Sequence, residues 1–252
     1  MKIEPIVGRR SQSVMSFSET RGTRRVLPPS LLISDRPVIR RFEDLEPVLY
    51  DVSSCRGMNP ELPVYEVYRD LGVGERGREI LSKHGVRYDA TVMPPLMLGK
   101  EYVKTIGHDH LPSIGEWTHP EVFEVLEGEA RFLVQRYRGE EVVDVSLITA
   151  YEGDVVTVPP NCGHVVINTS SSTLVVGNLI SRDCLQTYDR FKNRRGAAYY
   201  LLEGGRLIRN DHYSELPKVR TMVAEPQVFV EKKSSLLTSF LDSPELFTFL
   251  SK

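Results

Sequence analysis

The sequence predicts an all-β fold built as a small antiparallel barrel, and three observations lead to this prediction. Short apolar and β-branched runs follow one another through the middle of the chain, separated by turn residues. Several runs alternate apolar and polar residues, as residues 64–68 do, which is typical of strands with one buried face. Two late runs flank Glu203-Gly204-Gly205, as the strands of a hairpin flank their turn. Such a succession of short strands is typical of an antiparallel barrel.

The prediction divides the chain into three regions. Residues 1–60 form an N-terminal extension, partly irregular, with one short helix over 42–50. Residues 61–210 form the barrel, and residues 211–252 form a C-terminal extension. Apolar residues recur at helical spacing over 234–250, which predicts a helix packed on the barrel or on a partner subunit.

Within the barrel, the elements are expected in a regular order. The strand over 64–68 precedes a short helix over 76–83, and residues 101–106 lead into a strand that carries two histidines. The remaining strands are expected over residues 86–93, 121–128, 130–137, 142–149, 155–158, 165–168, 174–180, 197–202 and 206–209.

Composition and charge argue against several classes of protein. The 252 residues carry a net charge of −2, and this near balance argues against general nucleic-acid or membrane binding. No apolar run approaches the roughly 20 residues of a membrane span, and the N-terminus lacks the apolar core of a secretion signal. A cytoplasmic protein is therefore expected. The 3 cysteines are odd in number and widely spaced, which does not describe a disulfide framework.

The N-terminal stretch departs from this balance. Residues 9–25 collect five arginines among serines and threonines, with Glu19 as the only acid. Two interpretations stay open for this stretch: a flexible basic arm, or an extension that lies over the barrel or over a neighbouring subunit.

The strongest chemical signal is a set of three histidines and one glutamate. In a strand, residues two apart point to the same side, so His108 and His110 can reach one ion while Asp109 faces away. The same alternation places Glu121 on the inner face of the next run, and His164 follows a rigid Pro-Pro turn. Three neutral nitrogens and one carboxylate suit iron(II), manganese, nickel, cobalt or zinc. Open coordination positions would remain for substrate or water.

Other residues compete for a place in this set. Glu116 and His119 are rivals of Glu121 as the fourth ligand, but neither begins a strand that ends at a glycine. A lone histidine on an apolar face is more often a core residue than a ligand, yet half of the chain's 6 histidines fall into this pattern. Cys162 lies two residues before His164 and is expected to be a thiol of the pocket wall, not a ligand.

The order of these residues resembles the two-part signature of the cupin family. Gly107, the paired histidines, Glu121 and Gly128 make the first part, and His164 with Asn168 closes the second. The resemblance implies a jelly-roll β-barrel with a metal ion inside. Cupins usually leave three or four residues between the second histidine and the glutamate, whereas ten lie there in this chain. This segment is expected to bulge out as a loop.

Further segments resemble the cupin-type glucose-6-phosphate isomerases of archaea and some bacteria. They cover residues 65–68, 90–95, 99–110, 121–128 and 158–160, and the string Lys-Thr-x-Gly-His-x-His is the most specific. The resemblance implies a metal-dependent enzyme of glycolysis and gluconeogenesis, with iron(II) as the first choice of ion and a homodimer as the assembly. It implies these roles: metal ligands His108, His110, Glu121 and His164; catalytic base Glu121; phosphate contacts Thr91, Thr105 and Gly107; sugar contact Tyr65.

The chain departs from that family where the sugar is expected to lie. Phe123 and Asn161 stand where the family has tyrosines, and Ile180 and Gln186 stand where it has a tyrosine and a histidine. Tyr188 is a candidate to replace a lost hydroxyl. Changes of this kind alter specificity strongly, because buried polar groups then lose their partners.

The interconversion of glucose 6-phosphate and fructose 6-phosphate is therefore the first prediction for the function. The alternatives are another sugar-phosphate isomerase or epimerase, and a non-catalytic cupin that binds a sugar or nucleates an assembly. A metal-dependent oxygenase is a weaker alternative, because it leaves Thr91 and Thr105 unexplained.

Overall fold

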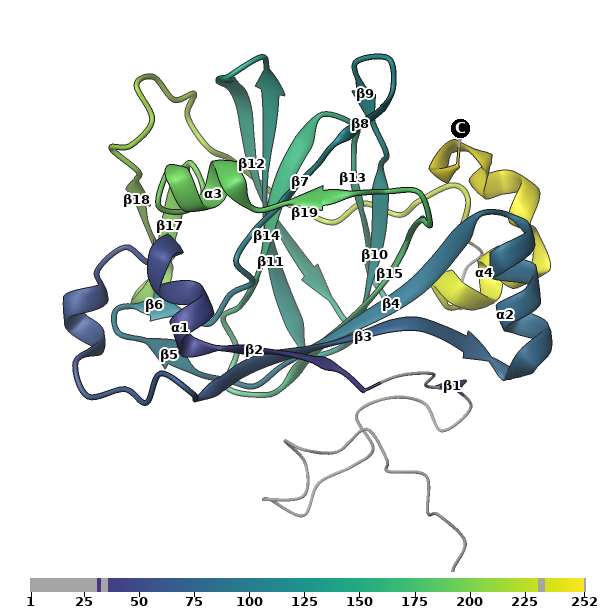
Figure 1. Cartoon of the computed structure of the whole chain (residues 1–252), viewed down its shortest axis with the longest axis horizontal. Coiled ribbons are helices and arrows are strands. Elements are labelled where there is room, and N and C mark those ends of the chain that lie inside the picture. The colour runs from purple at the N-terminus through teal and green to yellow at the C-terminus, as the bar shows by residue number, and fades with distance from the viewer. Residues whose placement is uncertain (1–30, 33–35, 231–233, 252) are drawn as a thin grey trace, which may run out of the picture.

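Two β-sheets face each other around a shared apolar core in the computed structural model (Figure 1). The structure describes residues 31–32, 36–230 and 234–251. The larger sheet contains, in spatial order, β1 (Leu31–Leu32), β3 (Pro63–Val73), β4 (Val86–Met93), β15 (Leu174–Ser181), β10 (Glu121–Glu127) and β13 (Val155–Val158), with β2 (Val38–Arg41) also paired to β3. The smaller sheet contains β14 (Cys162–Asn168), β11 (Glu129–Arg138), β12 (Glu141–Tyr151) and β19 (Arg220–Val223).

A further small sheet and two pairs of short strands complete the sandwich. One small sheet consists of β5 (Met97–Leu98), β6 (Glu101–Tyr102), β17 (Tyr199–Leu202) and β18 (Arg206–Arg209). Two further pairs are β7 (Asp109–His110) with β16 (Gln186–Thr187), and β8 (Pro112–Ile114) with β9 (Trp117–Thr118). The predicted hairpin around Glu203-Gly204-Gly205 is confirmed, since β17 and β18 pair across it.

Helices are few and short. They are α1 (Phe42–Leu45), η1 (Glu46–Val48), η2 (Val52–Cys55), α2 (Gly74–Lys83), α3 (Asp189–Asn193), η3 (Glu203–Gly205), α4 (Leu236–Asp242) and η4 (Pro244–Leu250). The single helix predicted over 234–250 is divided at Ser243, because Pro244 follows it and starts a separate 3-10 helix. The α3 helix was not predicted, since its five polar and aromatic residues are too few to show a helical period.

Strand β10 shows how one sequence alternation separates two apolar cores. Phe123 and Val125 belong to the cluster between the two sheets, whereas Val122 belongs to a second cluster on the outer face of the larger sheet. The helices α2, α4 and η4 supply the side chains that cover this outer cluster (Figure 1). Glu124 also points to this side, where its carboxylate accepts a hydrogen bond from the backbone N–H of Leu236 at 2.9 Å.

The segment between the second histidine and Glu121 leaves the two facing sheets, as predicted. It is an ordered excursion, because it contains the β8–β9 hairpin, which projects at the top of Figure 1. Asn161 secures this hairpin to the β13–β14 turn: its N–H donates to Thr118 Oγ1 at 2.7 Å, and its Oδ1 accepts from the Thr118 N–H at 3.1 Å. Asn161 also adopts a left-handed φ of 60°, which asparagine tolerates better than most residues.

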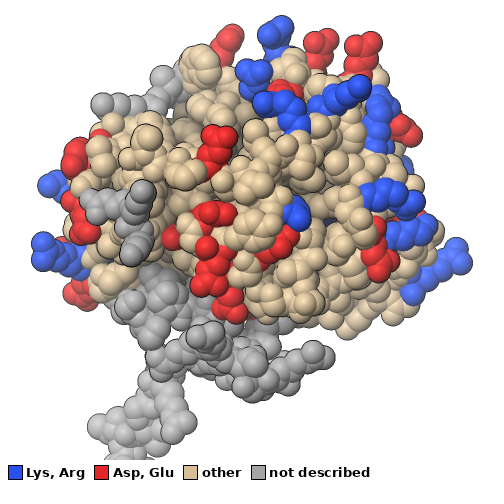
Figure 2. Space-filling model, turned by 180° about the vertical axis from the view of Figure 1, so that it is seen from behind, with Lys and Arg blue, Asp and Glu red and all other residues tan. Residues whose placement is uncertain are grey.

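Charges of both signs share the molecular surface. On the face drawn in Figure 2, Lys and Arg side chains gather along the right-hand margin, with Asp and Glu among them. No helix in the described part of the chain is long and apolar enough to span a membrane. The arginine-rich residues 9–25 lie outside the described residues.

Candidate metal centre

Strand β10 of the larger sheet, strand β14 of the smaller sheet and the segment that leads into β7 bring the predicted ligands together inside the sandwich. His108 and His164 face each other across an isolated antiparallel bridge, in which each N–H donates to the other residue's carbonyl oxygen, at 3.2 and 3.1 Å. His110 follows on β7, and Glu121 begins β10 on the opposite sheet. His110, Glu121 and His164 are buried, whereas His108 is partly exposed. The four residues form a group whose ligand atoms all lie within 4.8 Å of one another.

The spacing within this group fits a first-row divalent ion. Oε2 of Glu121 lies 3.2 Å from Nε2 of His110, 3.4 Å from Nε2 of His164 and 3.7 Å from Nε2 of His108. Two ligand atoms bound at about 2.1 Å to one ion, at tetrahedral or octahedral angles, lie roughly 3.0–3.4 Å apart. Within the described residues, Glu121 Oε2 and the Nε2 atoms of His108 and His110 have no hydrogen-bond partner. Buried polar atoms seldom lack partners, so a cation would satisfy them.

Neighbouring groups fix the orientation of two candidate ligands. Nδ1 of His110 donates to the carbonyl oxygen of His119 at 2.7 Å, so Nε2 is the ring nitrogen that faces Glu121. Nδ2 of Asn178 donates to Oε1 of Glu121 at 2.7 Å, so Oε2 is the oxygen that faces the imidazoles. The rival ligands Glu116 and His119 lie outside the group, although the backbone of His119 supports it.

Burial and mutual proximity shift the pKa values of these groups. Burial lowers the pKa of His108, and burial together with the neighbouring His108 lowers the pKa of His164 well below its usual value, so both imidazoles are neutral near pH 7. Burial alone would raise the pKa of Glu121, but the adjacent imidazoles lower it well below the usual range. Burial also opposes protonation of His110, yet Cys184 and Glu121 together raise its pKa to about 10. A divalent ion would compete with that proton.

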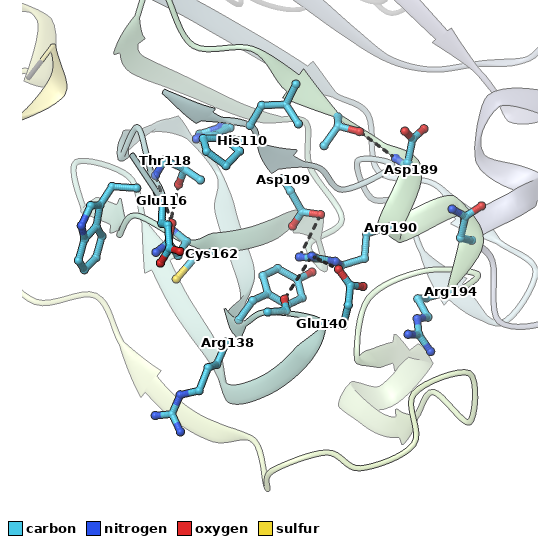
Figure 3. A pocket seen from close by; sticks show the side chains of 18 of the residues that line it. Asp109, His110, Glu116, Thr118, Arg138, Glu140, Cys162, Asp189, Arg190 and Arg194 are labelled. Atoms are coloured by element: carbon cyan, nitrogen blue, oxygen red, sulfur yellow. Dashed lines mark hydrogen bonds and ion pairs between the residues drawn. The ribbon is translucent and has the colours of Figure 1, made fainter. Parts of the chain in front are cut away.

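Asp109 points away from the metal group, as the strand alternation predicts. Figure 3 shows its carboxylate directed towards Arg190, whose guanidinium lies 3.7 Å from Asp109 and 3.1 Å from Glu140. Asp109, Glu140 and Arg190 line a pocket on the outer side of β7. Cys162 lines the same pocket. Burial raises the pKa of the Cys162 thiol to about 12, so the thiol stays protonated, as expected for a side chain of the pocket wall.

A second cavity lies on the inner side of β7, next to the candidate ligands. It is lined by His108, Glu121 and His164, and also by all five residues predicted to bind substrate: Tyr65, Thr91, Thr105, Gly107 and Tyr188. These residues come from segments up to 123 positions apart in the chain, between residues 65 and 188. The structure thus brings the predicted phosphate and sugar contacts to one cavity with the metal group.

Glycine is required at position 107. Its φ is +83°, and a Cβ there would lie 2.5 Å from the Phe191 ring and 2.7 Å from Val165 Cγ2. The missing side chain therefore allows the close packing of this loop beside the cavity. The neighbouring Thr105 accepts a hydrogen bond from the Val166 N–H at 3.1 Å, which leaves its own hydroxyl hydrogen available for a ligand.

Comparison with known proteins places this architecture in a family. A family model described as Glucose-6-phosphate isomerase (GPI) matches residues 39–218. The chain belongs to the glucose-6-phosphate isomerase family. The relative named glucose-6-phosphate isomerase from Thermococcus gammatolerans is 25% identical over 203 residues, which cover 79% of this chain and 100% of that relative. The relative of the same name from Pyrococcus furiosus is 25% identical over 192 residues, which cover 75% of this chain and 93% of that relative.

The similarity to solved structures is weaker. The structure titled recombinant oxalate oxidase in complex with glycolate is 14% identical, with a TM-score of 0.37, and the match covers 49% of this chain and 54% of that one. A similarity of this size adds nothing to the family assignment.

Two of the four residues predicted to depart from the family pattern line the inner cavity. The Phe123 and His164 rings pack in a T-shaped arrangement with centroids 5.2 Å apart, and Gln186 accepts a hydrogen bond from Arg69 at 3.3 Å. Asn161 instead lines the outer pocket, where it holds the inserted hairpin. The expectation that Asn161 stands beside the ligands in the sugar pocket is therefore wrong, because the strand end turns it towards Thr118.

Sequence reasoning missed four polar residues of this cavity, Arg40, Arg69, Asp89 and Asn178. Arg40 reaches the cavity from β2, a strand that the prediction left inside an irregular extension. Asn178 lies in the middle of an apolar strand, on the same face as Glu121. A polar residue within an apolar strand could have pointed to Asn178 as a site residue. Arg40 lies in a stretch whose sequence does not alternate clearly, so no pattern indicated that it reaches the cavity.

Proposed function

We propose that this chain is a metal-dependent aldose–ketose isomerase that interconverts glucose 6-phosphate and fructose 6-phosphate. One observation carries the proposal: a single cavity joins the His108, Glu121 and His164 side chains to Thr91, Thr105 and Gly107. The first set suits a cation, and hydroxyl and backbone N–H groups suit a phosphate. Membership in the glucose-6-phosphate isomerase family agrees with this pairing of sites.

The proposed metal ligands are His108, His110, Glu121 and His164, and iron(II) is the first choice of ion. A bound divalent ion would act as a Lewis acid that polarises the substrate oxygens at C1 and C2. The orphaned nitrogens and the Glu121 oxygen provide the donor set, and the Asn178 amide holds the carboxylate in place. The same donor set accepts manganese, nickel, cobalt or zinc.

Glu121 is the proposed catalytic carboxylate as well as a ligand. Isomerisation moves one hydrogen from C2 to C1 and one proton from the C2 oxygen to the C1 oxygen, so a base must lie beside both carbons. Oε1 of Glu121 accepts one hydrogen bond, from Asn178, and retains a second lone pair that can take a proton. Tyr65 and Tyr188 would contact the sugar, and Thr91, Thr105 and Gly107 its phosphate.

Substrate entry requires side-chain movement. The free volume of the inner cavity is about 60 Å³, which is smaller than a hexose phosphate. The Tyr188 ring stands 6.0 Å from the His108 ring at the cavity wall. Tyr188 is therefore the side chain that we expect to move first.

A different sugar phosphate is the second candidate substrate. Phe123 and Gln186 line the cavity where family members have hydroxyl and imidazole groups, and such exchanges change which sugar hydroxyls find a partner. The metal and phosphate sites would be unchanged in this case. Activity on a hexose phosphate other than glucose 6-phosphate and fructose 6-phosphate would support this second candidate.

The first experiment is a coupled isomerase assay on protein stripped of metal and reloaded with each ion in turn. We expect turnover with at least one ion. Replacing a ligand, as in His108→Ala, should lower kcat/KM at least 100-fold, whereas His212→Ala, which alters an exposed histidine, should change it less than about 2-fold. A protein that is stabilised by hexose phosphates but turns over none would be a binding protein, and the isomerase proposal would fail.

The predicted homodimer and cytoplasmic location belong to the same proposal. Many soluble enzymes form two-fold dimers, and cupin-type relatives are expected to pair in this way. Light scattering on the eluting peak of a size-exclusion column measures the mass directly, with 28.6 kDa as the value for one chain.

A further inference from the structure

Arg40 lies at the wall of the inner cavity but belongs to the N-terminal segment. It is the third residue of β2 and pairs with Tyr65 of β3, so both side chains reach the same face of the sheet. Both residues line the cavity. The Arg40 side chain is 26% exposed, so most of its surface is shielded from water.

The positive charge of Arg40 is poorly balanced by the protein. Its ion-pair partner among the described residues is Asp44, at a distance of 3.9 Å, the outer limit for such a pair. The other arginine at the cavity, Arg69, lies 3.1 Å from the buried carboxylate of Asp89. Arg69 thus has a close carboxylate partner, which it shares with Arg87 at 2.9 Å, whereas the nearest carboxylate to Arg40 in the described part of the chain is 3.9 Å away and leaves its donors for another anion.

An aromatic ring connects Arg40 to the metal group. The Arg40 guanidinium lies 5.3 Å from the centre of the Tyr188 ring, and one of its nitrogens lies 3.4 Å from the Tyr188 hydroxyl. The Tyr188 ring is 6.0 Å from that of His108. The Tyr188 ring thus lies between the Arg40 guanidinium and the proposed reaction site. This separation suits the phosphate end of a hexose phosphate better than C1 and C2.

We propose that Arg40 binds the phosphate of the substrate and completes the site formed by Thr91, Thr105 and Gly107, an inference that rests on the proposed function. A guanidinium supplies paired N–H donors and a full positive charge, which hydroxyl and backbone N–H groups lack. The N-terminal segment is therefore part of the substrate site. Tyr188, which now accepts from Arg40, would give way to the phosphate oxygens.

The next residue along the strand provides a matched control. Arg41 does not line the cavity, and its guanidinium pairs with Glu61 at 2.8 Å on the outside of the sheet. Replacing either arginine by glutamine removes one positive charge from the same strand. A difference between the two variants therefore reports on the cavity and not on the net charge.

The test measures inorganic phosphate binding by calorimetry to the metal-loaded protein and to Arg40→Gln and Arg41→Gln. We expect Arg40→Gln to bind phosphate about 10- to 100-fold more weakly, and Arg41→Gln to bind within about 2-fold of the unsubstituted protein. Metal content and the midpoint of thermal unfolding are measured on all three proteins, to exclude loss of the ion or of the fold. Equal phosphate affinity in the two variants, or no phosphate binding by the unsubstituted protein, overturns the proposal.

Kinetics separate this proposal from the proposed function. Arg40→Gln should raise KM for fructose 6-phosphate about 10-fold or more and change kcat much less, because the contact forms equally in the ground and transition states. Arg40→Lys should recover part of the loss, since it restores the charge without the paired donors. If the unsubstituted protein binds phosphate through Arg40 but isomerises no hexose phosphate, the isomerase function fails while the anion site stands.

Discussion

The hydrogen bond from Asn178 to Glu121 is the contact on which the geometry of the candidate metal group most depends. Both residues are buried, and the bond is 2.7 Å long. They are diagonal neighbours on adjacent strands, since Phe123, two residues after Glu121, pairs directly with Asn178. Without the amide, the carboxylate could rotate and present either oxygen to the imidazoles. Asn178 is thus expected to act by positioning the ligand, with no contact to the ion.

We predict that Asn178→Ala weakens metal binding about 10- to 100-fold, the usual effect of removing a group that orients a ligand. Chelator competition on the purified protein measures the dissociation constant. The loss of kcat should be restored in part by excess metal, because the four ligands remain. A dissociation constant equal to that of the unsubstituted protein would show that Glu121 needs no such support.

At the scale of elements, Glu124 links β10 to the start of α4. Its side chain is 5% exposed, and the buried carboxyl group accepts a hydrogen bond from the Leu236 N–H. Burial raises its pKa from 4.5 to about 7, against the smaller effect of the Leu236 hydrogen bond. The contact joins the C-terminal helix to the outer face of the larger sheet, so its protonation affects how firmly that helix is held.

The pH dependence of this contact follows from the direction of its pKa shift. Between about pH 4.5 and 7, the unfolded chain ionises Glu124 while the folded protein keeps it protonated. Its contribution to the unfolding free energy is therefore fully present below pH 4.5 and is lost as the pH rises to about 7, by at most about 1.4 kcal/mol per pH unit.

We predict that Glu124→Gln removes this dependence. From pH 4.5 to 7, the unsubstituted protein should lose this contribution to its unfolding free energy, whereas the Glu124→Gln variant should not. The variant should therefore become more stable relative to the unsubstituted protein as the pH rises, as measured by urea unfolding at several pH values. Glu127→Gln, which alters a less buried carboxyl group at the C-terminal end of the same strand, is the control and should show a smaller change. An equally small change in Glu124→Gln would mean that this carboxyl group ionises normally in the folded state.

At the scale of the whole molecule, the candidate metal group joins the two sheets. His164 comes from the smaller sheet, Glu121 from the larger one, and His108 and His110 from the chain that crosses between them. An ion bound there would bind the folded protein and not the unfolded chain, so it should stabilise the whole sandwich.

We predict that removing metal with a chelator lowers the midpoint of thermal unfolding, and that adding back the ion restores it. At an ion concentration 100 times the dissociation constant, linkage gives about 2.7 kcal/mol of stabilisation. Differential scanning calorimetry measures the shift, and His108→Ala should show a smaller one than His212→Ala. An unfolding midpoint that does not respond to any first-row divalent ion would argue against a metal at this site.

The sequence by itself determined the β-rich architecture, the inward direction of His108, His110, Glu121 and His164, and the outward direction of Asp109. Each of these follows from a period of two along a strand, which is a local property of the chain. Local reasoning of this kind needs no knowledge of which strands are neighbours. The resemblance to the glucose-6-phosphate isomerases, and not the strand period, pointed to Thr105 and Gly107.

Only the tertiary structure decided that Arg40 and Asn178 share the cavity with the predicted residues. Arg40 enters it because β2 pairs with β3, and Asn178 meets Glu121 because β15 pairs with β10, and neither pairing follows from the period of a single strand. The position of Asn161 was likewise decided by the β8–β9 hairpin, which binds it through Thr118 and holds it at the outer pocket, away from the inner cavity. Strand pairing and register depend on contacts between segments remote in sequence. A sequence pattern therefore predicts which face of a strand a side chain occupies, but not which residues of other strands lie beside it.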